Sequence, residues 1–205
     1  MNNNAITLAS YQEKADEYVK GTRQIVTGDN KDWLDRMANL LKRDAEVLEL
    51  GSGFGRDATY LESLGYKVIC SDAVSSFIEH LRKGGHVTKF INVLEDSLEG
   101  PYDAILANMV FLHFDTNELV DILANVHNAL KPSGLLAFSV RRGEGSEWSN
   151  DKLGAPRYYK YWSHEDLKGQ IATAKFDLID VRYGDSTNPD KIYVVARCSP
   201  VNEPQ

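Results

Sequence analysis

Apolar residues recur in two different patterns along the middle of this chain of 205 residues. Short apolar runs predict buried strands at 46–50, 67–71, 87–91, 102–108 and 135–140. Apolar positions three or four residues apart predict helices between them, at 56–64, 74–83 and 117–130. Strands that alternate with helices in this way form a parallel sheet with right-handed crossovers. The pattern therefore predicts a doubly wound α/β domain over residues 44–199.

The pattern changes after the fifth predicted strand. Residues 141–162 are polar and aromatic with several glycines, and we expect a long loop there. A short helix capped by Ser163 follows. Two apolar runs joined by a short turn then predict an antiparallel hairpin, at 176–183 and 192–198. Residues 200–205 are expected to be a tail.

The residues before the first strand show weaker patterns. We expect residues 1–9 to be a disordered leader and residues 10–43 to form N-terminal helices. The first of these helices carries Tyr11 and Tyr18 on one face, because they lie seven residues apart. Packing against the domain explains that spacing as well as a ligand site does.

A glycine-rich turn directly follows the first predicted strand. The sequence VLELGSGFGRD places Gly51, Gly53 and Gly55 between that strand and the next helix. Glycines let the backbone turn sharply and approach a ligand, and the first turn of the helix offers free N–H groups. The second strand leads to Asp72, 21 residues after Gly51, where a carboxylate can accept hydrogen bonds from ribose hydroxyls. This arrangement predicts a site for a nucleoside cofactor.

The glycine spacing narrows the kind of cofactor. Dinucleotide-binding proteins use G-x-G-x-x-G, whereas this turn reads G-S-G-F-G, with Arg56 and Asp57 where the third glycine would fall. Glu49, at the end of the strand, suits a ligand with an ammonium group better than a pyrophosphate. These motifs resemble the first two motifs of the class I S-adenosylmethionine-dependent methyltransferases, and the resemblance extends over roughly residues 10–197. It implies a mostly parallel sheet of seven strands with helices on both faces and an antiparallel C-terminal hairpin.

The resemblance also implies the cofactor, S-adenosylmethionine, with S-adenosylhomocysteine as product. It places the glycine turn at the methionine end, with contacts from Glu49, Gly51, Ser52, Gly53 and Gly55. Arg56 is expected to pair with the cofactor's carboxylate, although a solvated arginine on a helix explains this residue too.

The nucleoside end of the cofactor is expected at the next strands. Asp72 would accept both ribose hydroxyls, with Ala73 beside the nucleoside. The family contacts adenine just after the third strand, which indicates the side chain of Asn92 and the backbone of Val93. A strand that ends later would give this role to Glu95 or Asp96 instead.

Two further parts of the chain are expected to contact the cofactor. Asn108 and Met109 follow the fourth strand, at the edge where open α/β sheets bind ligands. The Asn108 carbonyl is expected to accept the methionine ammonium. In many members of the family an N-terminal helix folds over the cofactor, and this implies that Tyr11 and Tyr18 line the pocket.

The acceptor side of the site carries less specific signals. The loop at 141–162 is expected to be a lid or substrate wall, and its arginines and aromatic residues suit an anionic or planar acceptor: Arg141, Trp148, Arg157, Tyr158 and Tyr159. His113 is the histidine nearest the ligand edge, where it acts either as a general base or as a packing or capping residue. The segment after the fourth strand lacks the Asn-Pro-Pro-Tyr-type motif of amino-methylating nucleic-acid enzymes.

Composition restricts partners and location. The chain has 23 Lys and Arg against 30 Asp and Glu, a formal charge of −7, and no basic block that would favour nucleic acid. No apolar run approaches the roughly 20 residues of a membrane span, and the first residues do not resemble a secretory signal. Cys70 and Cys198 lie in predicted strands, and no metal-ligand spacing is present. We expect a cytoplasmic monomer or homodimer without a metal.

These features predict an enzyme that methylates an oxygen, nitrogen or sulfur atom of a small-molecule acceptor. Methyl transfer mainly requires alignment of the nucleophile and exclusion of water, so the absence of a recognisable catalytic triad is compatible with it. Two alternatives stay open. One is a tRNA or protein methyltransferase with the same cofactor half, and the other is a non-catalytic cofactor-binding or interaction module.

Overall fold

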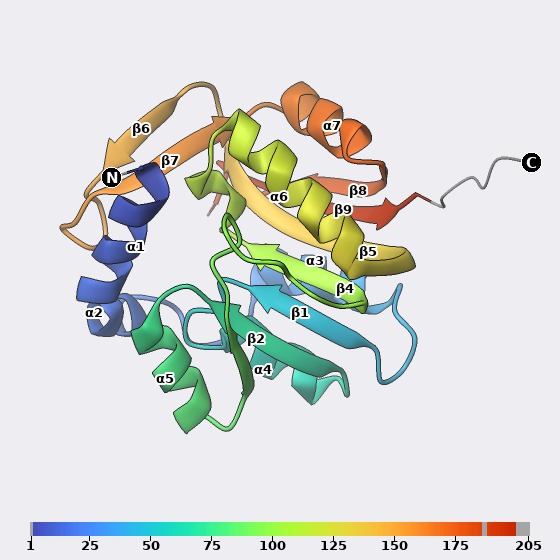
Figure 1. Cartoon of the computed structure of the whole chain (residues 1–205), viewed down its shortest axis with the longest axis horizontal. Helices are drawn as coiled ribbons and strands as arrows, with labels where there is room; N and C mark the ends of the chain where they lie inside the picture. Colours follow the sequence, from blue (N-terminus) through green and yellow to red (C-terminus); the bar gives the residue numbers. More distant parts are fainter. Residues whose placement is uncertain (1, 186–187, 200–205) are drawn as a thin grey trace, which may run out of the picture.

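The computed structural model describes residues 2–185 and 188–199, and a twisted sheet runs through its centre (Figure 1). Its parallel strands are β1 (Glu46–Leu50), β2 (Lys67–Asp72), β3 (Val87–Phe90), β4 (Tyr102–Asn108) and β5 (Leu130–Arg142). Its antiparallel strands are β8 (Phe176–Tyr183) and β9 (Lys191–Cys198). The strand order is β3-β2-β1-β4-β5-β9-β8. The predicted α/β fold with its C-terminal hairpin is confirmed.

The described residues form nine strands, not the seven predicted. The additional strands, β6 (Ser146–Ser149) and β7 (Arg157–Trp162), form a hairpin in the stretch that was expected to be a loop. β7 also pairs with the end of β5. The buried side chains of β7 are Arg157, Tyr159 and Trp162. Because the run RYYKYW carries aromatic residues on both faces, no alternation of polar and apolar residues marks it as a strand.

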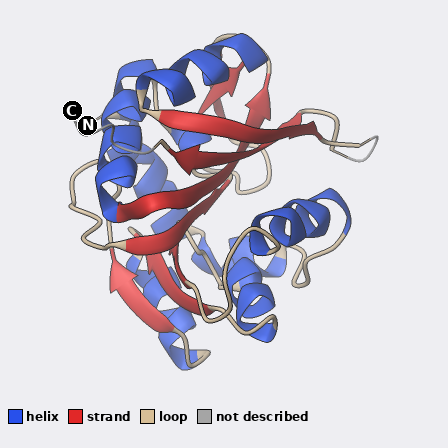
Figure 2. Cartoon of the chain, turned by 90° about the vertical axis from the view of Figure 1, so that its right-hand side faces the viewer, coloured by secondary structure: helices blue, strands red, loops and turns tan. Residues whose placement is uncertain are grey.

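Helices cover both faces of the sheet (Figure 2). They are α6 (Thr116–Ala129) and α7 (His164–Thr173) on one face, and α3 (Gly28–Ala38), α4 (Arg56–Ser63) and α5 (Ser75–Lys83) on the other. Leu123 of α6 and Leu167 of α7 belong to one apolar core, whereas Trp33 of α3 and Leu61 of α4 belong to the second. The two cores hold the carboxyl ends of the parallel strands in fixed positions.

Two N-terminal helices, α1 (Asn3–Glu13) and α2 (Ala15–Lys20), lie at the edge of the molecule, with α1 against the β6–β7 hairpin (Figure 1). The expectation of a disordered leader is wrong for residues 3–9, which are helical. The Asn2 side chain caps α1 by accepting from the Ala5 N–H at 2.8 Å. Met1 and the predicted tail at 200–205 lie outside the described residues.

The buried face of α1 is polar. Asn4, Thr7 and Ser10 are each at least nine-tenths buried, and all three form hydrogen bonds to distant parts of the chain. A helix that buries polar residues has no apolar period in its sequence, so the hydrophobic pattern does not reveal it.

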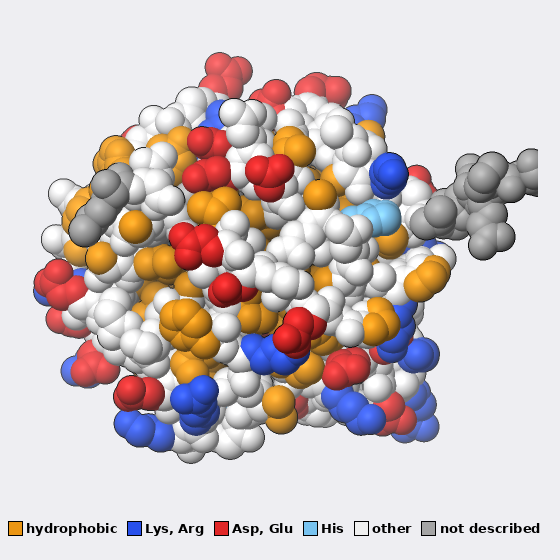
Figure 3. Space-filling view, in the orientation of Figure 1, with side chains coloured by type: hydrophobic (Ala, Val, Ile, Leu, Met, Phe, Trp, Pro, Cys, Tyr) orange, Lys and Arg blue, Asp and Glu red, His pale blue; other side chains and the backbone are white. Residues whose placement is uncertain are grey.

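One face of the molecule is mixed in charge. On the face drawn in Figure 3, acidic and basic side chains are interspersed among apolar and uncharged ones. Within the described residues, none of the helices is long and apolar enough to span a bilayer.

Candidate functional site

The glycine turn lies where the strand order reverses, between β1 and β4. Gly51 and Gly53 have φ angles of 61° and 57°, in the region that favours glycine. A Cβ on Gly51 would come within 2.6 Å of Val110, so this position requires glycine. The Ser52 hydroxyl fixes the turn by donating to the Glu49 carbonyl at 3.1 Å.

Two adjoining cavities lie beside this turn, and we name them by their linings. The apolar cavity contacts Leu8, Asp72, Ala73, Phe77, Asn92 and Val93. The polar cavity contacts Glu49, Ser52, Arg56, Arg141, Arg157 and Tyr159. Both cavities are lined by Tyr11, Tyr18, Gly51, Asn108, Met109 and His113. The fold thus brings most of the predicted site residues into one continuous site.

Asp72 ends β2 beside the apolar cavity and is 7% exposed. Its carboxylate oxygens accept the N–H groups of Gly53 and Val74, both at 2.9 Å. Burial raises the pKa of Asp72 to about 6, although these backbone hydrogen bonds act in the opposite direction. Each carboxylate oxygen has a second lone pair, so Asp72 can also accept hydroxyl groups of a ligand.

Asn92 and Val93 follow β3 and line the apolar cavity, whereas the alternatives Glu95 and Asp96 do not. The Asn92 side-chain oxygen accepts from the Asn4 amide of α1 at 3.0 Å. Asn4 lines the same cavity and was not predicted as a site residue. The only sequence signal there is a run of asparagines, which does not indicate a binding site.

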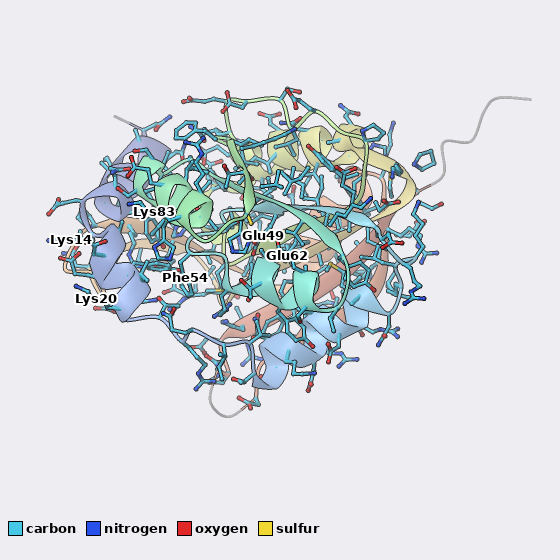
Figure 4. The ribbon with its side chains drawn as sticks, turned by 90° about the horizontal axis from the view of Figure 1, so that it is seen from below. Lys14, Lys20, Glu49, Phe54, Glu62 and Lys83 are labelled. Carbon is cyan, nitrogen blue, oxygen red and sulfur yellow. The ribbon has the colours of Figure 1, made fainter. Side chains whose placement is uncertain are left out.

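Glu49 is 3% exposed and lines the polar cavity near the centre of the molecule (Figure 4). Burial, reinforced by the nearby Asp57 carboxylate, raises the pKa of Glu49 well above its ordinary value. Among the described residues, its Oε2 atom has no hydrogen-bond partner. A buried carboxyl oxygen without a partner is unfavourable, and a cationic ligand group would satisfy it.

Arg56 begins α4 and lines the polar cavity, but its guanidinium is held by Asp57 through two hydrogen bonds of 2.7 and 3.0 Å. Asp57 also accepts from Asn30 of α3 at 3.1 Å and from the Asn108 side chain at 2.5 Å. The pairing of Arg56 with a cofactor carboxylate and the ammonium contact of the Asn108 carbonyl stay predictions. The network itself ties α3, α4 and β4 together behind the glycine turn.

Gly55 differs from the other glycines of the turn, since it lines neither cavity. It caps α4 with a φ of 84°, and a Cβ there would lie 2.8 Å from Leu81. Packing therefore explains this glycine without a ligand.

Met109 lines both cavities and has a φ of 61°, which is unusual for a residue with a side chain. Its N–H donates to both the carbonyl and the hydroxyl of Ser139, at 3.1 and 3.0 Å. Backbone strain of this kind concentrates at functional sites, so the conformation of Met109 is in keeping with its predicted place in the site.

His113 lies where the two cavities meet. Its Nδ1 is 2.7 Å from the Tyr158 carbonyl oxygen, which can only accept, so Nδ1 carries the proton. Nε2 then accepts from the Tyr11 hydroxyl at 3.1 Å. Burial lowers the pKa of His113 to about 4, and the cations of Arg157 and Arg141 act in the same direction. A neutral ring whose lone pair is bonded to Tyr11 is a weak base, so its geometry favours positioning of Tyr11 over proton removal.

The low pKa of His113 predicts a specific loss of stability in acid. The unfolded chain binds a proton near pH 6.5 and the folded chain only near pH 4, so stability falls as the pH decreases through this window. Between pH 7.5 and 4.5 we expect the wild type to lose on the order of 2–3 kcal/mol more of its unfolding free energy than His113→Gln. Urea unfolding at both pH values measures this difference, and His80→Gln, at an exposed site on α5, is the matched control. Equal losses in wild type and His113→Gln would contradict the assignment.

The predicted acceptor contacts divide into two groups. Those that line the polar cavity are Arg141, Arg157 and Tyr159. Trp148 and Tyr158 line neither cavity; their rings lie 5.7 Å apart, and Trp148 is 44% exposed. Two lysines of the polar cavity, Lys152 and Lys191, were missed because an isolated lysine in a loop or at a strand end carries no signal in a single sequence.

The sulfur and imidazole groups of the described residues are dispersed. No three or more His, Cys, Asp or Glu side chains among them are arranged to hold a metal ion. Cys70 and Cys198 are buried free thiols, and burial raises the pKa of both. Neither thiol lines a site cavity.

Solved methyltransferase structures share this fold. The 1,6-didemethyltoxoflavin-N1-methyltransferase of Burkholderia thailandensis, with 1,6-didemethyltoxoflavin and S-adenosylhomocysteine bound, is 22% identical at a TM-score of 0.72, covering 96% of this chain and 87% of that chain. A methyltransferase of Methanosarcina mazei is 18% identical at a TM-score of 0.71, covering 80% and 97%. The glycopeptide N-methyltransferase MtfA in complex with S-adenosylmethionine is 14% identical at a TM-score of 0.67, covering 82% and 93%. At these identities the similarity establishes the fold.

The sequence itself establishes the family. None of the curated proteins matches the chain. A family model described as a methyltransferase domain matches residues 20–181, which is well over half of the chain. The matched span includes the glycine turn, Asp72 and the end of β4. The chain therefore belongs to the methyltransferase domain family, as its motifs predicted.

Proposed function

We propose that this protein binds S-adenosylmethionine and transfers its methyl group to an oxygen, nitrogen or sulfur atom of a small-molecule acceptor. The observation that carries the proposal is the unsatisfied Glu49 oxygen beside the glycine turn, next to the cavity that holds the Asp72 carboxylate. These two acids suit two of the polar parts of the cofactor, because its ammonium group needs an acceptor and its ribose offers hydroxyl donors. The similar enzyme of Burkholderia thailandensis binds S-adenosylhomocysteine, and MtfA binds both forms of the cofactor.

The apolar cavity suits the nucleoside. We assign the ribose hydroxyls to Asp72 and the adenine to Asn92 and Val93, with Ala73 beside them. Tyr11 and Tyr18 cover this part of the site from the N-terminal helices, with ring centroids 5.4 Å apart in an edge-to-face arrangement. We assign the methionine end to Glu49 and to the backbone of the glycine turn.

The bound cofactor supplies a methyl group on a positively charged sulfur, which is a good leaving group, so the protein needs little acid–base chemistry. Its main task is to orient the acceptor and exclude water. α1 and β7 meet over the site, where the Ser10 hydroxyl donates to the Pro156 carbonyl at 2.6 Å and the Tyr158 N–H donates to Thr7 at 3.1 Å. We place the point of transfer near Met109 and His113, which line both cavities. His113 orients Tyr11 there.

Enclosure and charge favour a small acceptor over tRNA or protein. A tRNA or a protein would have to enter beneath the cover that α1 and β7 form. The many phosphates of a tRNA outside the cavity would also meet a chain with a formal charge of −7. The Burkholderia thailandensis enzyme, which has the same fold, binds the small molecule 1,6-didemethyltoxoflavin. A non-catalytic module would bind the cofactor through the same residues but would transfer no methyl group.

Calorimetric titration with S-adenosylhomocysteine tests the cofactor assignment. We expect one site per chain with a Kd of about 1–100 μM, in the range of ordinary cofactor complexes. No heat at millimolar ligand would contradict the proposal. Transfer from methyl-labelled S-adenosylmethionine to a panel of small amines, alcohols, phenols and thiols tests the activity. Transfer only to tRNA or protein would favour the first alternative, and cofactor binding with no transfer to any acceptor would favour the non-catalytic module.

A further inference from the structure

Four cationic side chains meet at the polar cavity from separate elements. Arg141 lies at the end of β5, Arg157 begins β7, Lys191 begins β9, and Lys152 lies in the turn between β6 and β7. Within the described ranges 2–185 and 188–199, none of the four forms an ion pair with a carboxylate. Arg157 is buried, Arg141 and Lys191 are half-buried, and Lys152 is exposed. Buried cations are normally paired with a carboxylate, so the surroundings of these side chains are informative.

The side-chain contacts of the two lysines are with neutral groups, while charged residues act on both lysines through space. Lys152 donates to the Thr22 hydroxyl at 2.6 Å and lies 4.2 Å from the centre of the Tyr18 ring. Lys191 lies 5.5 Å from the centre of the Tyr193 ring. Burial and neighbouring cations lower the pKa of both lysines to about 8. Both therefore stay largely charged at neutral pH, without a carboxylate partner.

The two arginines flank one aromatic ring. The guanidinium carbons of Arg141 and Arg157 lie 5.3 and 5.1 Å from the centre of the Tyr159 ring. Arg157 is only 3% exposed and donates to the carbonyl of Asp151 and to the Tyr11 hydroxyl. The Nε atoms of both arginines are buried without a hydrogen-bond partner among the described residues. Each arginine thus has an N–H donor that forms no hydrogen bond among the described residues.

The acids of the polar cavity do not balance these charges. Asp57 is held by Arg56 through both carboxylate oxygens, and Glu49 is the other acid in the lining. In the proposed function, Glu49 faces the cofactor's ammonium, and a single cation suffices for the cofactor's carboxylate. A surplus of positive charge is left on the acceptor side. It is buried at Arg157 and half-buried at Arg141 and Lys191, where uncompensated charge is costly.

We propose that the methyl acceptor carries an anionic group, a carboxylate or a phosphate, that is bound in the polar cavity by Arg141, Lys152, Arg157 and Lys191. This inference rests on the proposed function and specifies its acceptor. Guanidinium groups bind both kinds of anion in a bidentate manner, and the lysines add point charges. The polar cavity shares Met109 and His113 with the apolar cavity, so an anion held there keeps the rest of the acceptor close to the point of transfer.

Titration of inorganic phosphate into protein saturated with S-adenosylhomocysteine tests the inference. Saturation occupies the position of the cofactor's own carboxylate, so phosphate that still binds must use the acceptor side. We expect binding in the millimolar range, weakened about tenfold in Lys152→Gln and in Arg141→Gln, because each variant loses a charge-assisted hydrogen bond. Lys83 lies at the exposed end of α5, away from both cavities, and Lys83→Gln should bind phosphate like the wild type (Figure 4).

The affinity of each variant for S-adenosylhomocysteine shows whether the cofactor half is folded. Two variants are used so that the test still holds if one of them does not fold. No heat from phosphate at high millimolar concentration overturns the inference, as does equal affinity in all three variants. Phosphate that binds the free protein but not the loaded protein also overturns it, because the cations then serve the cofactor's carboxylate. Failure of S-adenosylhomocysteine itself to bind would overturn the proposed function instead.

Discussion

Replacement of Asp72 by asparagine is expected to weaken S-adenosylhomocysteine binding about 100-fold. The charged acceptor of the ribose hydroxyls becomes a neutral one, and each hydrogen bond to a charged group contributes about 1.5–3 kcal/mol. The new amide group must also face a backbone N–H, that of Gly53 or that of Val74, where the carboxylate accepts hydrogen bonds now. Calorimetry at pH 8 measures the difference, since this pH lies above the pKa of about 6 of the Asp72 carboxyl group.

The pH dependence of binding gives a second measurement for the same variant. Hydroxyl donors stabilise the ionised carboxylate, so ligand binding lowers the pKa of Asp72, and the wild-type affinity should fall as the pH decreases below about 6. Asp72→Asn should lack this decline. Asp121→Asn removes an exposed carboxylate on α6 and controls for the change in net charge. An affinity of Asp72→Asn within about threefold of the wild type would contradict the ribose assignment.

Trp33→Ala is expected to cause a large loss of stability, about 3–5 kcal/mol of the free energy of unfolding. Trp33 is 1% exposed on α3, and its ring centroid lies 5.3 Å from that of Tyr193. Its Nε1 donates to the Val194 carbonyl at 3.0 Å. Truncation leaves a cavity between α3 and the sheet. Guanidinium unfolding monitored by circular dichroism measures the loss, provided that the denaturant slope is unchanged.

Two variants separate the contributions at this position. Trp33→Phe removes the hydrogen bond but keeps most of the packing, so it should cost about 1–2 kcal/mol. Trp148→Ala removes a tryptophan that is 44% exposed on β6 and should cost less than about 1 kcal/mol. Similar losses for Trp33→Ala and Trp148→Ala would show that α3 does not depend on the packing described above.

The sequence predicted the features that depend on nearby residues. Strand, glycine turn and helix follow one another in the chain, so the geometry of Gly51 and Gly53 is fixed locally. Asp72 ends the adjacent parallel strand, and pairing of β1 with β2 brings it back to the turn. The two additional strands were not predicted because RYYKYW resembles a binding loop as much as a strand. The part of α1 before residue 10 was not predicted as a helix because polar residues occupy its buried face.

The acceptor side depends on residues that only the tertiary structure brings together. Lys152 and Lys191 reach one cavity from a turn and from the start of β9, 39 positions apart, and no local pattern connects them. The pairing of Arg56 with its neighbour Asp57 was also hidden, because adjacent residues on a helix normally point in different directions. These two lysines and this ion pair determine the charge of the acceptor cavity, and the sequence alone did not give that charge.

The cover over the site is held by hydrogen bonds more than by apolar packing. Among the described residues, α1 and α2 share a small apolar cluster whose buried members are Ala15, Val74 and Phe77, far fewer than either main core contains. We therefore expect separation of these helices from the domain to be a local opening that leaves the sheet intact. The free energy of this local opening is separate from the free energy of global unfolding. Substitutions in α1 or α2 can therefore change the rate of product release without changing the stability of the fold.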